Sequence, residues 1–169
     1  MRIVVNDANI LIDLVELALL PHFFDLQFEF HTTALVLDEL FEEQQEALTP
    51  YIDQNLLKVS DISAEELVEI SKLQIAKPKL SEQDCSAFFQ ARAKGGTLIT
   101  SDKNLRKYAA EQALEVHGHL WIFDKMVEAA TISPQRASEK LIELCEVINP
   151  RLNLPQKECE KRHTAWQNL

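Results

Sequence analysis

The chain has little glycine, proline or cysteine, and it has no long uninterrupted hydrophobic run. Three Gly and six Pro among 169 residues are too few for a fibrous or a disordered chain. Acidic residues interrupt the apolar N-terminal region, which argues against a membrane-spanning helix, and no signal-peptide pattern follows Met1. We therefore expect one soluble, cytoplasmic domain that is large enough to bury a substantial core.

The three cysteines, Cys85, Cys145 and Cys159, are odd in number and widely spaced, and they include no Cys-x-x-Cys pair. This pattern disfavours both a disulfide framework and a zinc site. Cys85 and Cys145 fall on apolar faces of expected helices. We expect all three to be reduced thiols, and these two to fill the core.

The net charge of −10 is unevenly distributed along the chain. Residues 38–69 contain ten acidic side chains and one basic one, whereas residues 77–107 carry a net charge of +4. The basic segment could hold a phosphate backbone despite the acidic total. The alternative is that it forms an ordinary solvated face.

Short apolar runs alternate with helical patterns of about 10 to 15 residues, which is typical of right-handed βαβ units. The expected strands are 3–5, 27–31, 56–59, 97–100 and 114–116. The expected helices follow Asp7, Thr33 (through Phe41), Ser63, Ser81 and Asp102, with a further piece toward Tyr51 and two more at 120–130 and 134–148. Pro21 is expected to end the first helical pattern and Pro78 that of the helix after Ser63.

This order of elements predicts a three-layer α/β/α sandwich with a mainly parallel five-stranded sheet. We expect residues 1–130 to form the domain and residues 131–169 to extend it with helices. The polar tail after Arg151 either docks through Trp166 or stays mobile.

Two acids follow expected strands directly. Asp7 comes after the first strand and Asp102 after the fourth, and ligands bind at the carboxyl edge of an open α/β sheet. Each acid is also a good helix N-cap, so both interpretations stay open. Asp84 is explained as a capping-box partner of Ser81, because chain direction alone is not expected to bring this helix start to the same edge.

Glu39 falls on the polar arc of its expected helix, together with Glu43. Periodicity alone therefore makes it a solvated residue.

Four motifs in order carry a resemblance to a known family. They are Asp7-Ala-Asn9-Ile-Leu-Ile-Asp-Leu, Leu37-Asp-Glu39-Leu, Leu80-Ser-Glu-Gln-Asp84 and Gly96-Thr-Leu-Ile-Thr-Ser-Asp102-Lys-Asn104-Leu. With them the chain resembles a PIN domain of the VapC type over most of residues 1–116. Val116-His-Gly-His-Leu-Trp-Ile is similar to the Gly-x-Leu tail of one PIN subgroup.

The resemblance implies a metal-dependent nuclease that acts on RNA and holds Mg²⁺ or Mn²⁺. Its metal-binding and catalytic acids would be Asp7, Glu39, Asp84 and Asp102. The chemistry agrees, since hard divalent ions take oxygen ligands and clustered carboxylates repel one another without a cation. VapC-type toxins also pair with a small antitoxin and often form dimers, so both partners are expected.

Polar and basic residues near the motifs have supporting roles in this interpretation. Asn9, Thr33 and Ser101 would orient a carboxylate or a bound water, although a cap or turn bond explains each equally well. Asn104 stands where many relatives have another acid, which weakens the case for a second metal, and its amide could be a neutral ligand. Phosphate contacts are expected from Lys103, Arg106 and Lys107.

Three rival interpretations remain. A zinc site at His117 and His119 is disfavoured by their spacing and by the lack of Cys or His partners. A phosphoacceptor receiver domain is disfavoured because the chain continues well past the fifth strand. An inactive PIN-like module that binds RNA or a protein without cutting stays open, and Mg²⁺ titration would distinguish it.

Overall fold

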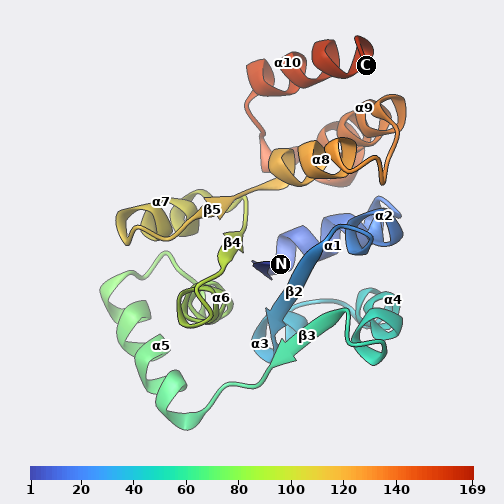
Figure 1. The fold of residues 1–169 in the computed structure, drawn as a ribbon. Helices are drawn as coiled ribbons and strands as arrows, with labels where there is room; N and C mark the ends of the chain where they lie inside the picture. The colour runs from blue at the N-terminus through green and yellow to red at the C-terminus, as the bar shows by residue number, and fades with distance from the viewer.

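A five-stranded parallel sheet runs through the centre of the computed structural model, which describes residues 1–169 (Figure 1). The strand order is β3-β2-β1-β4-β5, and every pair of neighbours is parallel. The strands are β1 (Arg2–Asn6), β2 (Phe28–Thr33), β3 (Leu57–Ser60), β4 (Thr97–Ile99) and β5 (Val116–His117). The chain reverses its direction of winding between β3 and β4, so β1 and β4 lie side by side although they are far apart in sequence.

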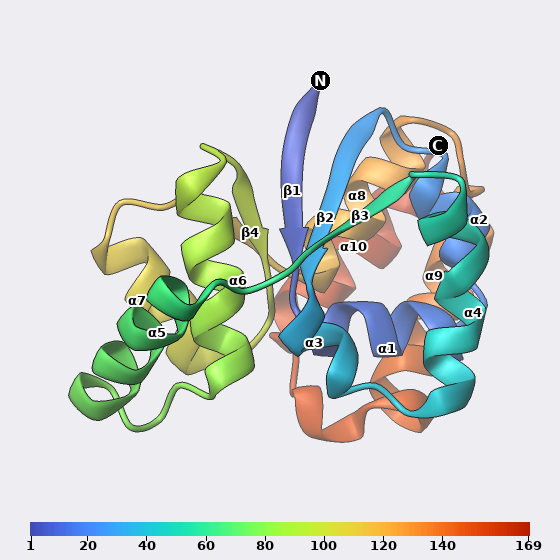
Figure 2. The ribbon, with the colours of Figure 1, turned by 90° about the horizontal axis from the view of Figure 1, so that it is seen from below.

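Helices cover both faces of the sheet and complete the predicted α/β/α sandwich (Figure 2). One face carries α1 (Ala8–Glu16), α2 (Leu20–Phe24) and α4 (Glu42–Asp53). The other carries α5 (Ala64–Ala76), α6 (Glu82–Ala93) and α7 (Lys103–Glu111), with α6 packed directly on β1, β2 and β4. The short α3 (Ala34–Asp38) lies between the end of β2 and α6.

The C-terminal part forms a group of helices at one end of the molecule (Figure 1). It contains α8 (His119–Glu128), α9 (Pro134–Glu143), a π-helical turn (Leu144–Ile148), a 3₁₀ turn (Pro150–Leu152) and α10 (Gln156–Gln167). Trp166 on α10 is only 6% exposed and lies near Phe123 of α8, with ring centroids 6.3 Å apart. The polar tail therefore docks on the domain.

The core explains why the first strand and helix are so apolar. Val4 and Val5 of β1 and Ile10, Leu11 and Leu14 of α1 are almost completely buried. Burial of such side chains contributes about 1.5–3 kcal/mol each. None of the helices combines the length and the apolar character needed to cross a bilayer.

The cysteines are all free, as expected. Cys85 is buried in the core, and Cys145 and Cys159 are partly buried. Burial raises the pKa of the Cys85 thiol to about 12, which keeps it protonated and unreactive at neutral pH.

Several expected boundaries are wrong for identifiable reasons. Pro21 does not end a helical segment but lies in the first turn of α2, where its missing N–H costs no hydrogen bond. The helix expected through Phe41 ends at Asp38, and a new helix begins because the Gln44 side chain accepts a hydrogen bond from the Phe41 N–H (2.9 Å). The helix expected over 134–148 widens into a π turn at Leu144.

The strands also differ slightly from the prediction. β2 continues through Thr33, and β4 stops at Ile99, one residue earlier than expected. β5 is only Val116–His117 rather than 114–116. It is an edge strand that pairs only with β4, so short pairing is sufficient.

Candidate active site

Asp7 is both a helix cap and a buried acid at the carboxyl edge of the sheet. Its Oδ1 accepts a hydrogen bond from the Ala8 N–H (2.7 Å), and its Oδ2 accepts one from the Thr100 hydroxyl (2.7 Å). The residue is 3% exposed. Burial, followed by the charge of Asp84, raises the pKa of Asp7 from 3.8 to about 7, and Glu39 adds to the effect.

Asp102 lies at the same edge of the sheet as Asp7, because β4 is the neighbour of β1. It caps α7, with Oδ1 accepting from the Leu105 N–H (2.8 Å). The Asp102 N–H also donates to the Thr100 Oγ1 (3.1 Å), and Thr100 in turn donates to Asp7. Thr100 therefore connects the two acids. The sequence indicated only that Thr100 ends the fourth strand, so this contact was not predicted.

Asp84 makes the predicted capping box with Ser81 and also faces the other acids. The Ser81 Oγ accepts from the Asp84 N–H (3.0 Å), and the Asp84 Oδ2 accepts from the Ser81 N–H (2.8 Å). The expectation that this helix start would not face the site edge is wrong. A crossover helix runs antiparallel to the strands, so the first turn of α6 reaches the carboxyl edge, and Ser86 there contacts Thr33 of β2 (2.7 Å).

The charges of these acids act on one another. Burial and the charge of Asp102 raise the pKa of Asp84. The pKa of Asp7 is raised by the charge of Asp84, as described above. Carboxylates at the β1–α1 junction, in the first turn of α6 and at the β4–α7 junction thus act on one another, and a cation between them would relieve the repulsion.

Glu39 is not on a shared helical arc with Glu43, as the periodicity suggested. It is the C-cap residue of α3, whereas Glu43 belongs to α4. Glu39 is exposed, and partial desolvation together with the charge of Asp84 raises its pKa. The Glu39 carboxylate, on the solvent side, is therefore close enough to Asp84 for their negative charges to repel.

The donors present suit a hard divalent ion that keeps much of its water. No three His, Cys, Asp or Glu side chains lie close enough to hold a metal ion as a group. Asp84 and Asp102 each use one oxygen in a cap, and their other oxygens make no hydrogen bond within the chain. Mg²⁺ characteristically binds through one or two carboxylates plus waters and substrate phosphate, so this oxygen set fits it.

The expected supporting residues divide into two groups. Thr33 is used structurally, because its Oγ1 accepts from the Val36 N–H (3.1 Å) at the start of α3. Asn9 and Asn104 are exposed, and their side chains make no hydrogen bonds within the protein. Together with Asp102 and Lys103 they line a hollow of about 460 Å³ that continues to Asn149 and Arg151 of the C-terminal part.

The expected phosphate-binding residues all lie on α7. Lys103 and Lys107 are exposed, and Arg106 is half-buried, with Nη1 donating to the Thr100 carbonyl (3.1 Å). Of these, Lys103 lines the same hollow as Asp102.

A buried polar network behind Ser101 was not predicted. The Nε2 of His119 lies 2.8 Å from Asp13 Oδ2, and its Nδ1 lies 2.7 Å from the Ser101 Oγ. Asn149 also donates to Asp13 (3.1 Å), and His119 is only 2% exposed. Both ring nitrogens of His119 are therefore engaged within the protein, and neither is free to bind a metal ion. The only signal in the sequence is that Asp13 interrupts an otherwise apolar helix face.

Comparison with known protein families gives a match that covers nearly the whole chain. The model of a family described as a PIN domain matches residues 3–159. This range includes the four acids of the candidate site and all five strands except the first residue of β1. No curated protein matches the chain significantly.

Proposed function

The chain belongs to the PIN-domain family, and from this premise we propose that it is a Mg²⁺- or Mn²⁺-dependent endoribonuclease. PIN domains are generally nucleases that use divalent metals. The observation that carries the proposal is that Asp7, Asp84 and Asp102 come from three separate helix starts to one edge of the sheet, where the charge of Asp84 acts on Asp7 and that of Asp102 acts on Asp84. Three acids that cap three separate helix starts would gain nothing structurally from facing one another.

Each acid has a proposed role. Asp84 and Asp102 offer their free oxygens to the ion, and Asp7 joins them when it loses its proton. Glu39 completes the set from the solvent side. When bound, a divalent ion polarises the scissile phosphate and makes water a better nucleophile at neutral pH.

The remaining polar residues would position these groups. Thr100 holds Asp7 in place by its hydroxyl, and Ser101 holds the adjacent turn through His119. Asn9 and Asn104 reach the solvent side of the hollow next to Asp102, where they could orient water or phosphate. Lys103, Arg106 and Lys107 would contact flanking phosphates.

A cleavage assay tests the proposal. A single-stranded RNA with a fluorophore and a quencher at its ends should be cut in Mg²⁺ or Mn²⁺ and left intact in EDTA. The variant Asp7→Asn should lose nearly all activity, whereas Asp53→Asn, an exposed acid at the end of α4, should keep it. Full activity of Asp7→Asn, or equal activity in EDTA, would refute the proposed mechanism.

We also propose that the protein is the toxin of a toxin–antitoxin pair and forms a homodimer. The support is its resemblance to VapC-type proteins, together with large exposed apolar side chains such as Phe41 on the α3–α4 connection and Ile75 on α5. Light scattering of the purified chain tests the dimer. Growth arrest on expression that Asp7→Asn abolishes tests the toxin role.

Two observations favour a second candidate, a PIN-like module that binds without cutting. No three acidic or imidazole side chains form a ready metal cluster, and Asn104 replaces one acid of the family pattern. Such a module should show no thermal stabilisation by millimolar Mg²⁺. The nuclease should be stabilised by Mg²⁺ in a way that depends on Asp7.

A further inference from the structure

A second hollow lies next to the acids, at the meeting point of α7, β5 and the segment before α10. Its volume is about 390 Å³, within the range of small-molecule sites. We call it the extension pocket and define it by Lys103, Arg106, His117, Trp121, Leu154 and Arg162. Its outer wall comes from the C-terminal part of the chain, beyond the last strand of the sheet.

Two cations of this pocket have no acidic partner. Arg106 is half-buried and makes one hydrogen bond, to the Thr100 carbonyl, so most of its N–H groups have no acceptor in the protein. Lys103 likewise makes no ion pair. A half-buried guanidinium with unused N–H groups lining a pocket is a good donor to an anion, particularly to phosphate.

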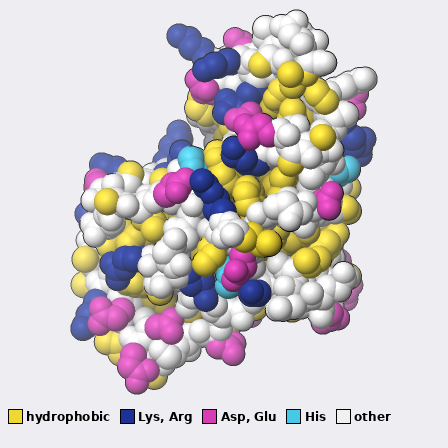
Figure 3. Space-filling model, in the orientation of Figure 1, with side chains coloured by type: hydrophobic (Ala, Val, Ile, Leu, Met, Phe, Trp, Pro, Cys, Tyr) yellow, Lys and Arg dark blue, Asp and Glu magenta, His cyan; other side chains and the backbone are white.

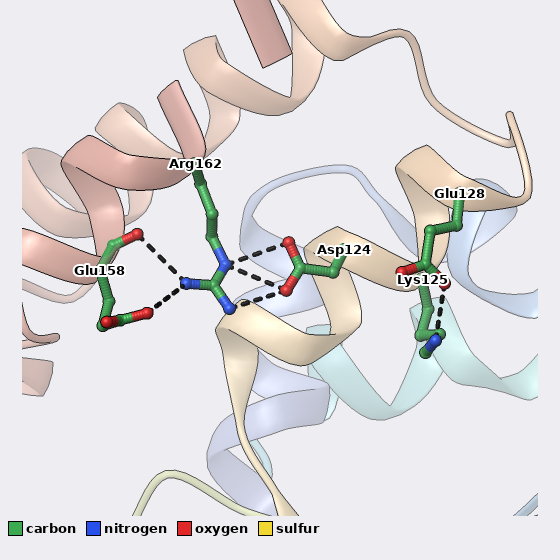
Figure 4. Close-up of polar contacts among 5 residues, drawn as sticks. All are labelled: Asp124, Lys125, Glu128, Glu158 and Arg162. Atoms are coloured by element: carbon green, nitrogen blue, oxygen red, sulfur yellow. Dashed lines mark hydrogen bonds and ion pairs between the residues drawn. The ribbon is translucent and has the colours of Figure 1, made fainter. Parts of the chain in front are cut away.

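On the opposite wall of the pocket, Arg162 differs from Arg106 because it is paired with acids. Arg162 of α10 donates to both oxygens of Asp124 (3.0, 3.1 and 2.7 Å) and to Glu158, as Figure 4 shows. These bonds tie α10 to α8 and fix the wall. Arg162 is therefore structural, and Arg106 and Lys103 are the cations that remain for a ligand.

The pocket also contains a pair of stacked aromatic rings. His117 and Trp121 are nearly parallel, with ring centroids 4.6 Å apart and an interplanar angle of 4°. Trp121 also stacks on Phe28, at 5.5 Å and 12°, so His117 is the ring of the pair that remains for a base. The side chain of His117 is 32% exposed. Aromatic rings beside unpaired cations are the combination that binds single-stranded nucleic acid, because every base has a face that can stack.

The extension pocket is continuous with the site of the acids. It shares Ser101 and Lys103 with the hollow that contains Asp102 and Asn9. On the face in Figure 3, Lys and Arg side chains alternate with Asp and Glu and form no continuous patch. With a net charge of −10, anion binding depends on local sites such as this pocket.

We propose that the extension pocket binds the nucleotide next to the scissile phosphate of a single-stranded RNA. Arg106 and Lys103 hold its phosphate, and the partly exposed ring of His117, backed by Trp121, stacks with its base. This inference rests on the proposed nuclease function and names the substrate as unpaired RNA, since a duplex would keep its bases out of the pocket. The C-terminal part of the chain, which forms the outer wall of the pocket, would thus take part in substrate binding.

Calorimetric titration in EDTA tests the inference without depending on metal or cleavage. The probes are the dinucleotides pUpU and pApA, with uridine and inorganic phosphate as partial ligands. We expect the dinucleotides to bind more tightly than either partial ligand. Arg106→Gln should weaken dinucleotide binding about tenfold or more, the range for a charged hydrogen bond. His117→Ala should weaken it roughly fivefold or more and leave phosphate binding unchanged.

Arg136→Gln is the matched control, because Arg136 is an exposed arginine on α9 without an ion pair. It should bind the dinucleotides like the wild type, and circular dichroism confirms that all variants fold. Absence of dinucleotide binding, equal binding of phosphate alone, or no effect of Arg106→Gln would overturn the inference. If the dinucleotides bind as expected but RNA is not cut in Mg²⁺ or Mn²⁺, the nuclease proposal fails and the pocket stands as a binding site.

Discussion

Removing the charge of Asp7 should stabilise the metal-free protein, and increasingly so as the pH rises. Asp7 is buried, and its pKa rises from 3.8 to about 7 in the folded chain. The folded state therefore binds this proton more tightly than the unfolded state does. The stability that this bound proton gives the folded state is fully present below about pH 4 and is lost as the pH rises toward about 7.

The pKa difference sets the size of the effect. A change from 3.8 to about 7 corresponds to roughly 4 kcal/mol once the pH exceeds both values. At pH 5 the Asp7 carboxyl is already ionised in the unfolded chain. Over 1 kcal/mol of the total loss of stability is therefore present at that pH. In Asp7→Asn the amide keeps the cap on α1, because Asn is as good an N-cap as Asp. We expect the advantage of the variant over the wild type to grow by roughly 2 kcal/mol between pH 5 and pH 8.

Thermal and urea denaturation of Asp7→Asn and the wild type, in EDTA at pH 5, 6, 7 and 8, measure this difference in stability. For a domain of this length the expected change is a relative gain of about 5 °C in Tm at pH 8. Asp53→Asn, which removes an exposed charge of the same kind, should show no such pH dependence. A difference between Asp7→Asn and wild type that is constant with pH, or that shrinks as the pH rises, would refute the claim that Asp7 is a buried, repelled acid.

Two further substitutions probe the structure around the acids. Asp13→Ala leaves the His119 Nε2 and the Asn149 amide without their buried acceptor, so urea denaturation should show a loss of about 3 kcal/mol, with little change in Asp53→Ala. If Asp13→Ala is as stable as the wild type, the network is not structural. Gly118→Ala would place a Cβ 2.5 Å from the Ser101 Oγ and 2.8 Å from Arg106 Nη1, so it should lower stability by about 1–3 kcal/mol and weaken dinucleotide binding. Gly95→Ala is its control: the Cβ there meets nothing within 4 Å but φ is +61°, so stability should fall by about 1 kcal/mol without any change in binding. Equal dinucleotide affinities of these two glycine variants would show that Arg106 is not displaced.

The sequence predicts the parts of the site that follow from strand order. Asp7 and Asp102 come directly after strands, and the carboxyl ends of parallel strands meet at one edge, so their proximity could be anticipated. The location of Asp84 required one more step, that a crossover helix runs antiparallel to the strands. From spacing alone the capping box explains Asp84, and only the family resemblance predicted it among the site acids.

Other features depend on contacts that periodicity does not contain. Glu39 lies at the end of α3 because this helix stops after five residues. The capping box of α4 starts a new helix shortly after it. The bond of His119 to Asp13 joins residues 106 positions apart, and Arg162 docks α10 through an acid 38 positions away. Such pairs are set by packing of whole helices, so no local pattern marks them.

The most direct test of the central claim is a crystal structure with Mn²⁺, located by its anomalous scattering. We expect one peak at the carboxyl edge of the sheet, with carboxylate oxygens of Asp7, Asp84 and Asp102 among its ligands or hydrogen-bonded to its waters. A peak elsewhere on the surface, or no peak at this edge while the three carboxylates keep only their capping bonds, would contradict it.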